Sequence, residues 1–198
     1  MPISYINRKN KPHYLIAKFT KKGNKRYYIV KNIEKYDKKD LLNEVPEGYE
    51  FYEYLYDARV VLRKKIKPIF TEKEKAITDA VMQKHETVEN YIIELDKESL
   101  LIYLPYFKLD DPDLEWMDSQ QFENIQSYLP KLRVIKKGKD YAIQRFCVLS
   151  RYYGWIVMET HEDLKYLCEK YCFHIDKKSL LNFWIDGEVF ENQEYDDW

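Results

Sequence analysis

The chain contains 198 residues, of which 45% are hydrophobic and 34% are charged, and its formal net charge is −1. This composition predicts a folded globular protein of one domain or two small ones, not a disordered chain. A nearly neutral charge also argues against a protein that binds nucleic acid over its entire surface.

The N-terminal part of the chain predicts an antiparallel hairpin. Residues 14–19 and 26–30 flank a turn in which Gly23 and Asn24 accept positive φ angles. The better core face of the first strand consists of Leu15, Ala17 and Phe19. Residues 33–45 follow with a weak helical pattern, which ends before a proline and a glycine.

A second hairpin and the first firm helix come next. Residues 49–56 and 59–66 predict two strands around a short turn. Thr71 and Glu74 then have the spacing of a capping box, in which the Thr hydroxyl accepts from the third helical amide and Glu74 reaches back. Apolar residues continue at helical spacing, so the sequence predicts a helix over 71–85.

The middle of the chain predicts a third hairpin, an acidic loop and a helix. Residues 91–95 and 100–104 form the hairpin. Its core face consists of Tyr91, Ile93 and Leu95. The acidic stretch 106–118 is the most loop-like part of the chain. Asp118 caps a helix whose apolar pattern continues to Leu129.

The C-terminal part is organised around a three-stranded meander. Residues 131–136, 141–148 and 155–158 are rich in β-branched, aromatic and aliphatic side chains and are separated by turns. Thr160 is the predicted N-cap of the last firm helix, with Asp163 at the third helical position. The apolar stripe of this helix consists of Leu164, Leu167, Cys168 and Tyr171.

These elements predict an α+β fold, in which antiparallel hairpins and meanders form one or two sheets and three to four helices pack on one face. The predicted organisation is an N-terminal lobe (1–105), an acidic linker (106–118), a C-terminal lobe (119–185) and an acidic tail (186–198). A short similarity between residues 96–103 and 176–183 suggests two related halves, 49–104 and 130–185. That duplication requires strands at 173–175 and 180–185, whereas a local interpretation makes Asp176 an N-cap and 179–184 a helical turn.

The charges are unevenly distributed. Lys and Arg number 17 against 8 Asp and Glu in residues 1–70, 5 against 14 in 71–130, 7 against 2 in 131–160, and 4 against 10 in 161–198. Two explanations stay open. Either the basic and acidic blocks pair with each other, or each block presents a charged face to a partner.

The cysteines predict buried thiols in a reducing compartment, because Cys147, Cys168 and Cys172 are odd in number and lie in apolar patterns. With His161 and His174, the last two cysteines could form a zinc site, but free Cys is also a small core residue. Core packing is the preferred interpretation, so no metal site is predicted. Cys147 has Arg145 and Arg151 nearby in sequence, but no base that would make it a nucleophile.

No catalytic or cofactor motif is present in the sequence: it has no P-loop, dinucleotide fingerprint, nucleophile elbow or zinc-protease motif. We therefore predict no catalytic residue and no cofactor. The N-terminus lacks the apolar core of a signal peptide, and the longest apolar run is too short to span a bilayer. The sequence predicts a soluble, cytoplasmic protein with no membrane contact and leaves self-association open.

One group of side chains in the meander is a candidate binding patch. It consists of Arg133, Arg145, Arg151, Tyr153 and Trp155. Arg, Tyr and Trp are frequent anchors in protein interfaces. The preferred function is therefore a small non-enzymatic binding or regulatory module that acts through protein contacts. The alternative is RNA or single-stranded nucleic-acid binding, because basic hairpins neutralise phosphates and aromatic rings stack on unpaired bases.

Overall fold

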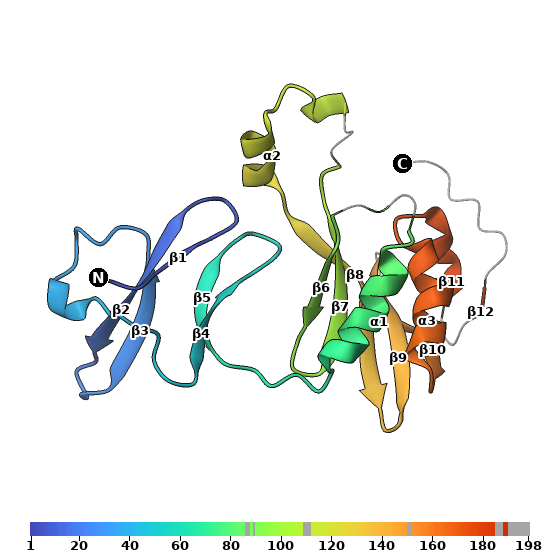
Figure 1. Cartoon of the computed structure of the whole chain (residues 1–198), viewed down its shortest axis with the longest axis horizontal. Helices are drawn as coiled ribbons and strands as arrows, with labels where there is room; N and C mark the ends of the chain where they lie inside the picture. Colours follow the sequence, from blue (N-terminus) through green and yellow to red (C-terminus); the bar gives the residue numbers. More distant parts are fainter. Residues whose placement is uncertain (86–87, 89, 109–111, 150–151, 185–187, 190–198) are drawn as a thin grey trace. The chain divides into compact units, whose positions relative to one another are not determined.

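A computed structural model of the chain describes residues 1–85, 88, 90–108, 112–149, 152–184 and 188–189 (Figure 1). The chain forms two compact units, and each unit combines two separate stretches of sequence. Unit 1 consists of Met1–Lys65 and Pro105–Tyr128, and unit 2 of Ile66–Leu104 and Leu129–Trp198. Both units contain antiparallel strands and a helix or helices, so the predicted α+β class is confirmed.

Unit 1 contains a three-stranded sheet, a separate hairpin and one short α-helix. The sheet has the order β1-β2-β3, with strands Ser4–Ile6, Pro12–Phe19 and Lys25–Val30. The hairpin consists of β4 (Tyr49–Glu53) and β5 (Val60–Lys64), and the helix is α2 (Ser119–Ile125). Single turns of 3-10 helix occupy Lys38–Asp40 and Pro112–Leu114. Both predicted N-terminal hairpins are therefore present.

The core of unit 1 is small and centred on β2. Leu15 and Ile16 point to opposite faces of β2 and are both buried, so other segments cover both faces of this strand. The Leu42 amide donates to the Leu15 carbonyl at 3.0 Å, and this segment lies along β2. Phe19 was predicted to share the core face, and that prediction is wrong. It is 72% exposed, because it lies at the end of the hairpin, beyond the part of β2 that other segments cover.

The helix predicted over 33–45 is not formed. Only Lys38–Asp40 is helical, as one 3-10 turn. Leu41 instead makes an isolated antiparallel bridge with Ile16, and the backbone amide of Leu42 bonds to β2. Tertiary pairing with the sheet therefore overrides a weak local helical pattern.

Unit 2 is built on a five-stranded antiparallel sheet of order β10-β9-β8-β7-β6. The strands in chain order are Ile92–Leu95, Ser99–Pro105, Tyr128–Lys137, Asp140–Leu149 and Tyr152–His161. All three segments of the predicted meander are strands, and each is longer than predicted. The third hairpin is also confirmed as β6 and β7, with Ile93 in the core and Tyr91 and Leu95 packed against it. A short pair, Phe183–Trp184 with Glu188–Val189, follows near the C-terminus.

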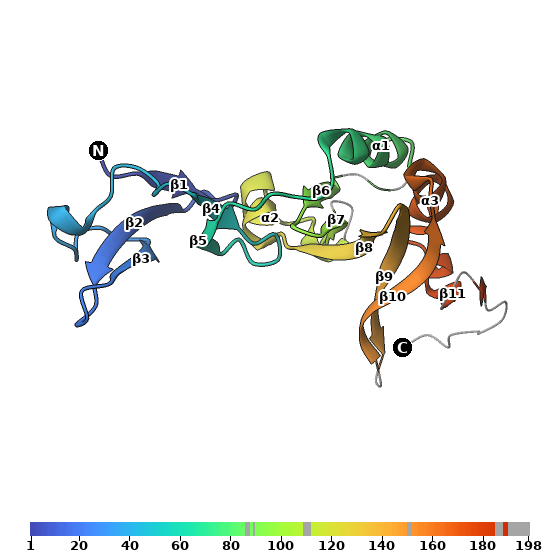
Figure 2. The ribbon, with the colours of Figure 1, turned by 90° about the horizontal axis from the view of Figure 1, so that it is seen from below.

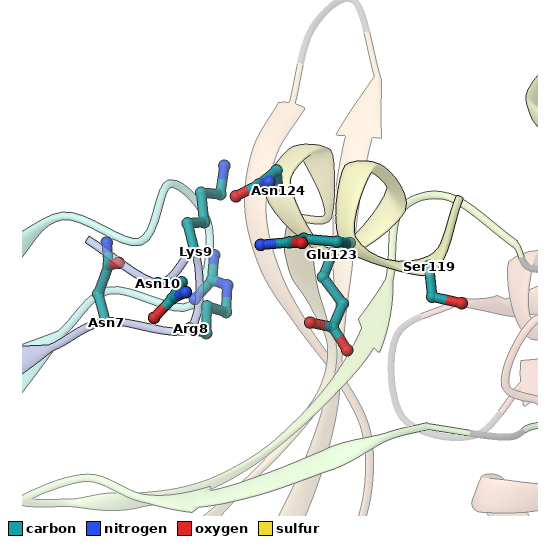
Figure 3. A pocket seen from close by; sticks show the side chains of 8 residues that line it. Asn7, Arg8, Lys9, Asn10, Ser119, Glu123 and Asn124 are labelled. Atoms are coloured by element: carbon teal, nitrogen blue, oxygen red, sulfur yellow. The ribbon is translucent and has the colours of Figure 1, made fainter. Parts of the chain in front are cut away.

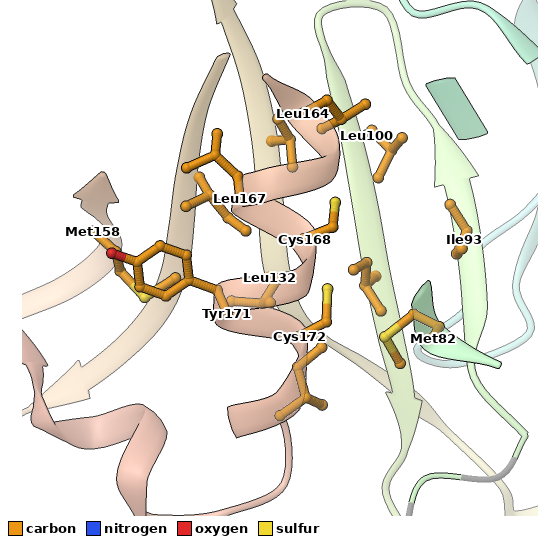
Figure 4. Packing of buried hydrophobic residues seen from close by; sticks show 14 of the residues in the cluster. Met82, Ile93, Leu100, Leu132, Met158, Leu164, Leu167, Cys168, Tyr171 and Cys172 are labelled. Atoms are coloured by element: carbon orange, nitrogen blue, oxygen red, sulfur yellow. The ribbon is translucent and has the colours of Figure 1, made fainter. Parts of the chain in front are cut away.

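Helices α1 (Glu72–Met82) and α3 (Leu164–Tyr171) pack against each other and against this sheet (Figure 2). The fully buried side chains Met82, Leu132, Leu167 and Tyr171 belong to one apolar cluster that links both helices to the sheet (Figure 4). The predicted capping box of α1 is present: Thr71 accepts from the Glu74 amide, and Glu74 accepts from the Thr71 amide. None of the helices in the described parts of the chain combines the length and apolar character that crossing a bilayer requires.

Helix α1 ends at Met82, three residues before its predicted end, and two further helix boundaries differ because of the sheet. Helix α2 ends at Ile125, and Leu129 belongs to β8. Helix α3 begins at Leu164 with Asp163 as its N-cap, and Asp163 accepts from the amides of the first helical turn. Thr160 is instead paired with Ala142 in the sheet. In both cases the strand ladder takes residues that local patterns assign to a helix.

The units divide the chain differently from the predicted lobes. Because β7 and β8 are neighbours in one sheet, the stretch 66–104 joins the C-terminal strands, while 105–128 belongs to unit 1. Since α2 lies in unit 1, a single face carrying all the helices is not confirmed. The two related halves are not confirmed either. Cys172–His174 and Lys178–Asn182 are 3-10 helical where the duplication requires strands, and Asp176 has φ +63° instead of the extended backbone of an N-cap.

Candidate functional site

The predicted binding patch is divided between the two faces of the unit 2 sheet. Trp155 pairs with Phe146, and Arg133 pairs with Gln144, so these four side chains share one face. Arg145 lies between Gln144 and Phe146 in β9 and therefore points to the opposite face. It is only 2% exposed, which corrects the expectation that it lies in solvent with the others.

The four residues on the common face form what we call the Trp155 cluster (Arg133, Gln144, Phe146 and Trp155). The guanidinium carbon of Arg133 lies 4.5 Å from the centre of the Trp155 ring, and its Nε donates to Gln144 Oε1 at 2.7 Å. The Phe146 ring meets the Trp155 ring edge-on at 5.1 Å. Burial lowers the pKa of Arg133. The cluster is thus a half-buried cation–π arrangement.

The rest of the predicted patch is not tested. Arg151 lies outside the described residues, as does the side chain of Tyr153, whose backbone pairs with Val148 in the β9–β10 ladder. The binding role of the patch therefore stays a prediction that now depends on the Trp155 cluster.

A second surface lies in unit 1, and sequence reasoning identified only its basic hairpin turn, residues 21–26. The first acidic residue of the chain is Glu34, so the β1–β3 sheet and its connections (residues 1–33, here called the basic sheet) carry nine cations and no carboxylate side chain. The cations are Arg8, Lys9, Lys11, Lys18, Lys21, Lys22, Lys25, Arg26 and Lys31. The charge count over residues 1–70 does not show that 1–33 lack carboxylates, because all acidic residues of that block follow position 33.

Few cations of the basic sheet form ion pairs with the part of the chain that the structure describes. Within the described residues only Arg8 of the nine forms an ion pair, with Glu53 at 3.2 Å. Lys18 and Lys25 instead lie over tyrosine rings, with Nζ at 5.0 Å from the Tyr36 centre and 5.5 Å from the Tyr27 centre respectively. Among the described residues, ion pairing between basic and acidic blocks neutralises one of the nine cations of this sheet.

The tip of the β2–β3 hairpin concentrates this charge. Gly23 has φ +80°, and its amide donates to the Thr20 carbonyl at 2.9 Å, which closes the turn between the strands. Lys21 and Lys22 are exposed in that turn. Beside them Phe19 is exposed as well, and Tyr28 on β3 is 45% exposed. Phe19 pairs with Lys25 and Tyr28 with Ile16, so the two rings lie on opposite faces of the hairpin and each face combines cations with one exposed ring.

A polar hollow of about 440 Å³ is also part of unit 1 (Figure 3). The β1–β2 connection forms one side of it and α2 forms the other. Its lining side chains are Asn7, Arg8, Lys9, Asn10, Ser119, Gln120, Glu123 and Asn124. The lining carries amides, a hydroxyl and charges of both signs. No sequence pattern signalled this hollow, because its two sides are more than a hundred residues apart.

The most strongly shifted carboxylate of the described residues has a structural environment. Burial raises the pKa of Glu74, but hydrogen bonds from Lys136, from the backbone and hydroxyl of Thr71 and from Tyr141 outweigh burial and lower it to about 2. The Lys136 Nζ and the Tyr141 hydroxyl lie 2.7 and 2.8 Å from Glu74 Oε1. Because these bonds already occupy the carboxylate, Glu74 serves to attach α1 to the β8–β9 hairpin.

Of the residues considered for a metal site, only the thiols of Cys168 and Cys172 are in hydrogen-bond contact with each other among the described residues. His161 belongs to β10 and not to α3, which contains Cys168 and has Cys172 as its C-cap. Both thiols are buried, and Cys168 Sγ lies 3.6 Å from the Thr78 hydroxyl. His174 Nδ1 bonds to Ser179 Oγ at 2.8 Å. Within the described ranges no three His, Cys, Asp or Glu side chains form a group suited to a metal ion.

Comparison with protein-family models, with curated proteins and with solved structures finds no match to this chain. A functional proposal therefore rests on the surfaces of the chain itself.

Proposed function

We propose that this protein is a non-enzymatic binding module whose basic sheet contacts the phosphates of a single-stranded nucleic acid. The observation that carries the proposal is the charge of residues 1–33, which hold nine cations, no carboxylate side chain and one ion pair among the described residues. A surface of unpaired cations attracts a polyanion, since each phosphate contact releases bound counterions.

A single strand suits this surface better than a duplex. Phe19 and Tyr28 expose their rings next to the cations of the β2–β3 hairpin. Aromatic faces stack on bases, but only when the bases are unpaired and accessible. The alternative is a purely structural role, in which basic turns keep a hairpin soluble and prevent edge-to-edge pairing. That alternative requires no affinity for nucleic acid, so binding measurements separate the two.

The test uses charge reversal at the hairpin tip with a matched control. The variant Lys21→Glu/Lys22→Glu changes two exposed lysines whose side chains take no part in closing the turn. The control Lys73→Glu/Lys84→Glu makes the same change at two exposed lysines of unit 2. Fluorescence anisotropy with a labelled oligouridylate at low salt should show affinity reduced by roughly tenfold or more in the first variant and nearly unchanged in the second. Equal affinities in both variants would remove the basic sheet from the proposal.

A second candidate function, protein binding through the Trp155 cluster, has its own support. Arg and Trp are enriched among the residues that dominate interface energies, and here they stack on each other on one face of the sheet. A pull-down from nuclease-treated lysate should retain a partner with Lys21→Glu/Lys22→Glu and lose it with Trp155→Ala. The opposite pattern would favour the nucleic-acid function alone.

The compartment is also a proposal. Three buried cysteines are free thiols. Free thiols are typical of the reducing cytoplasm, where we propose that the module acts.

A further inference from the structure

One side of the hollow in unit 1 is a turn whose backbone is held in place. Asn7 Nδ2 donates to the Ala58 carbonyl at 2.8 Å, and Asn7 Oδ1 accepts from the Lys11 amide at 2.8 Å. The backbone amide and guanidinium of Arg8 both bond to Glu53. These bonds fix the turn from both of its ends, so the position from which Lys9 projects is formed before any ligand arrives.

The same side of the hollow has an excess of donors. Lys9 makes no ion pair with any described carboxylate. Burial and the neighbouring charges of Arg8 and Lys11 lower the pKa of Lys9, and they outweigh the opposite effect of Asp57 and Glu53. Arg8, which also lines the hollow, has a buried Nε without a hydrogen-bond partner in the described chain. An anion beside Lys9 and Arg8 would reduce the repulsion between these two cations and would accept a hydrogen bond from them.

The opposite side of the hollow is the outer face of α2. Gln120, Glu123 and Asn124 lie three and four positions apart and share this face. Figure 3 shows Asn124 next to Lys9 across the hollow. The capping bonds of α2 are made by Asp118 and Gln121. The side-chain amides of Gln120 and Asn124 are not needed for them and make no hydrogen bond to other described residues. Free amides and a carboxylate are suited to the edges of nucleobases.

We propose that this hollow binds one nucleotide, with its phosphate at Lys9 and its base against the amides of Gln120 and Asn124. The inference rests on the proposed function, because it supplies a subsite in the unit that carries the basic sheet. A volume of about 440 Å³ is within the range of small-ligand sites. The nucleotide can be free or the phosphorylated end of a strand, since both carry the same chemical groups.

The test uses adenosine 5′-monophosphate as the probe and calorimetry on the full chain. Wild type should bind it saturably, and Lys9→Ala should weaken binding by roughly tenfold, about what one charge-assisted contact provides. Lys35→Ala is the matched control, because this exposed cation of unit 1 lies outside the basic sheet and does not line the hollow, and its affinity should stay within about twofold of wild type. Equal losses in the two variants would overturn the inference.

Two further arms define the ligand. Gln120→Ala/Asn124→Ala should weaken the binding of adenosine monophosphate and leave the binding of ribose 5-phosphate unchanged. If the variant instead weakened ribose 5-phosphate binding and not adenosine monophosphate binding, the proposed role of the amides would be contradicted. A labelled oligonucleotide whose affinity depends on both its 5′-phosphate and Lys9 identifies a strand end as the ligand. If that affinity depends on neither while the free nucleotide binds, the ligand is the free nucleotide.

The inference and the proposed function fail separately. Oligouridylate binding that is lost in Lys21→Glu/Lys22→Glu, together with no binding of adenosine monophosphate to wild type, sustains the function and overturns the subsite. Binding of the mononucleotide without any binding of the oligonucleotide sustains the subsite as a free-nucleotide site and overturns the function on which it was built.

Discussion

Four hydrogen bonds converge on the carboxylate of Glu74, from the Thr71 amide, the Thr71 hydroxyl, Tyr141 and Lys136. The Thr71 bonds belong to the helix cap, whereas Tyr141 and Lys136 come from strands more than sixty residues away. This one side chain therefore holds the start of α1 and the end of the β8–β9 hairpin together. The hydrogen bond to Glu74 and burial also raise the pKa of Tyr141 to about 12.

The Glu74 interactions should make stability depend on acid pH. Because the pKa of Glu74 is about 2 in the folded chain against 4.5 for a free Glu, its contribution is complete above pH 4.5 and disappears as the pH falls towards 2. Glu74→Gln should reduce the free energy of unfolding at pH 7 by about 2 kcal/mol. Urea titrations followed by helical circular dichroism should show the difference from wild type shrinking between pH 4.5 and 2. A difference that stays constant over this range would show that the charge of Glu74 is not what matters.

Single residues also mark where sequence reasoning works. The capping box of Thr71 and Glu74 was predictable because it is local. The face of Arg145 was predictable too, since alternation along β9 puts it with Ile143 and Cys147. Its burial was not, because that depends on what covers this face of the sheet. The contacts of Glu74 with β8 and β9 could not be predicted, since no local pattern encodes pairing over such a separation.

At the scale of elements, the β8–β9 turn depends on one glycine. Gly138 has φ +64°, and a Cβ added there would meet no atom within 4 Å. Gly138→Ala should therefore destabilise the fold only through backbone strain, by about 1 kcal/mol. Lys139→Ala changes the other residue of the turn and should alter stability by less than about 0.5 kcal/mol. Denaturation midpoints of the two variants test this, and an equally stable Gly138→Ala variant would contradict it.

Helix α3 should be sensitive at its buried face. Leu167 is fully buried between the helix and the sheet, whereas Leu181 in the 3-10 helix Lys178–Asn182 is 47% exposed. Leu167→Ala should cost about 2–5 kcal/mol, because it leaves a cavity, and Leu181→Ala should cost much less. Chemical denaturation compares the same substitution at both positions. If both substitutions reduced the free energy of unfolding by similar amounts, the burial of Leu167 in the core would be contradicted.

Elements with strong local signals were predictable, and those decided by pairing were not. The hairpins have alternation and turn residues, and all three predicted hairpins are present. The helix expected over 33–45 is replaced by a bridge from Leu41 to the sheet. Likewise Thr160 pairs with Ala142, which moves the start of α3 to Leu164. Long-range backbone pairing decided each of these cases.

At the scale of the whole molecule, the division into units predicts how fragments behave. A fragment of residues 1–105, the N-terminal lobe expected from the sequence, contains β6 and β7 but lacks β8, their neighbour in the sheet. The fragment also lacks nearly all of residues 105–128, which belong to unit 1. We expect poor dispersion in its proton NMR spectrum compared with the full chain. A well-dispersed spectrum with protected amides in β6 and β7 would contradict this division.

Candidate surfaces were only partly predictable. Local composition identified Arg133 and Trp155 as neighbours, and they are stacked in the structure. Charge pairing could not be judged from sequence, because it depends on which carboxylates come near the lysines. The nine cations of residues 1–33 are visible in the sequence, but that only one of them forms an ion pair among the described residues could be learned only from the structure.

The measurement that tests the central claim most directly is the salt dependence of oligouridylate binding by wild type and by Lys21→Glu/Lys22→Glu. If both lysines contact phosphates, the slope of log affinity against log salt should be shallower in the variant by about 1.4, since each contact with a single strand contributes about 0.7. The Lys73→Glu/Lys84→Glu control should keep the wild-type slope. Parallel lines for wild type and the hairpin variant, or no binding by wild type at low salt, would contradict the account.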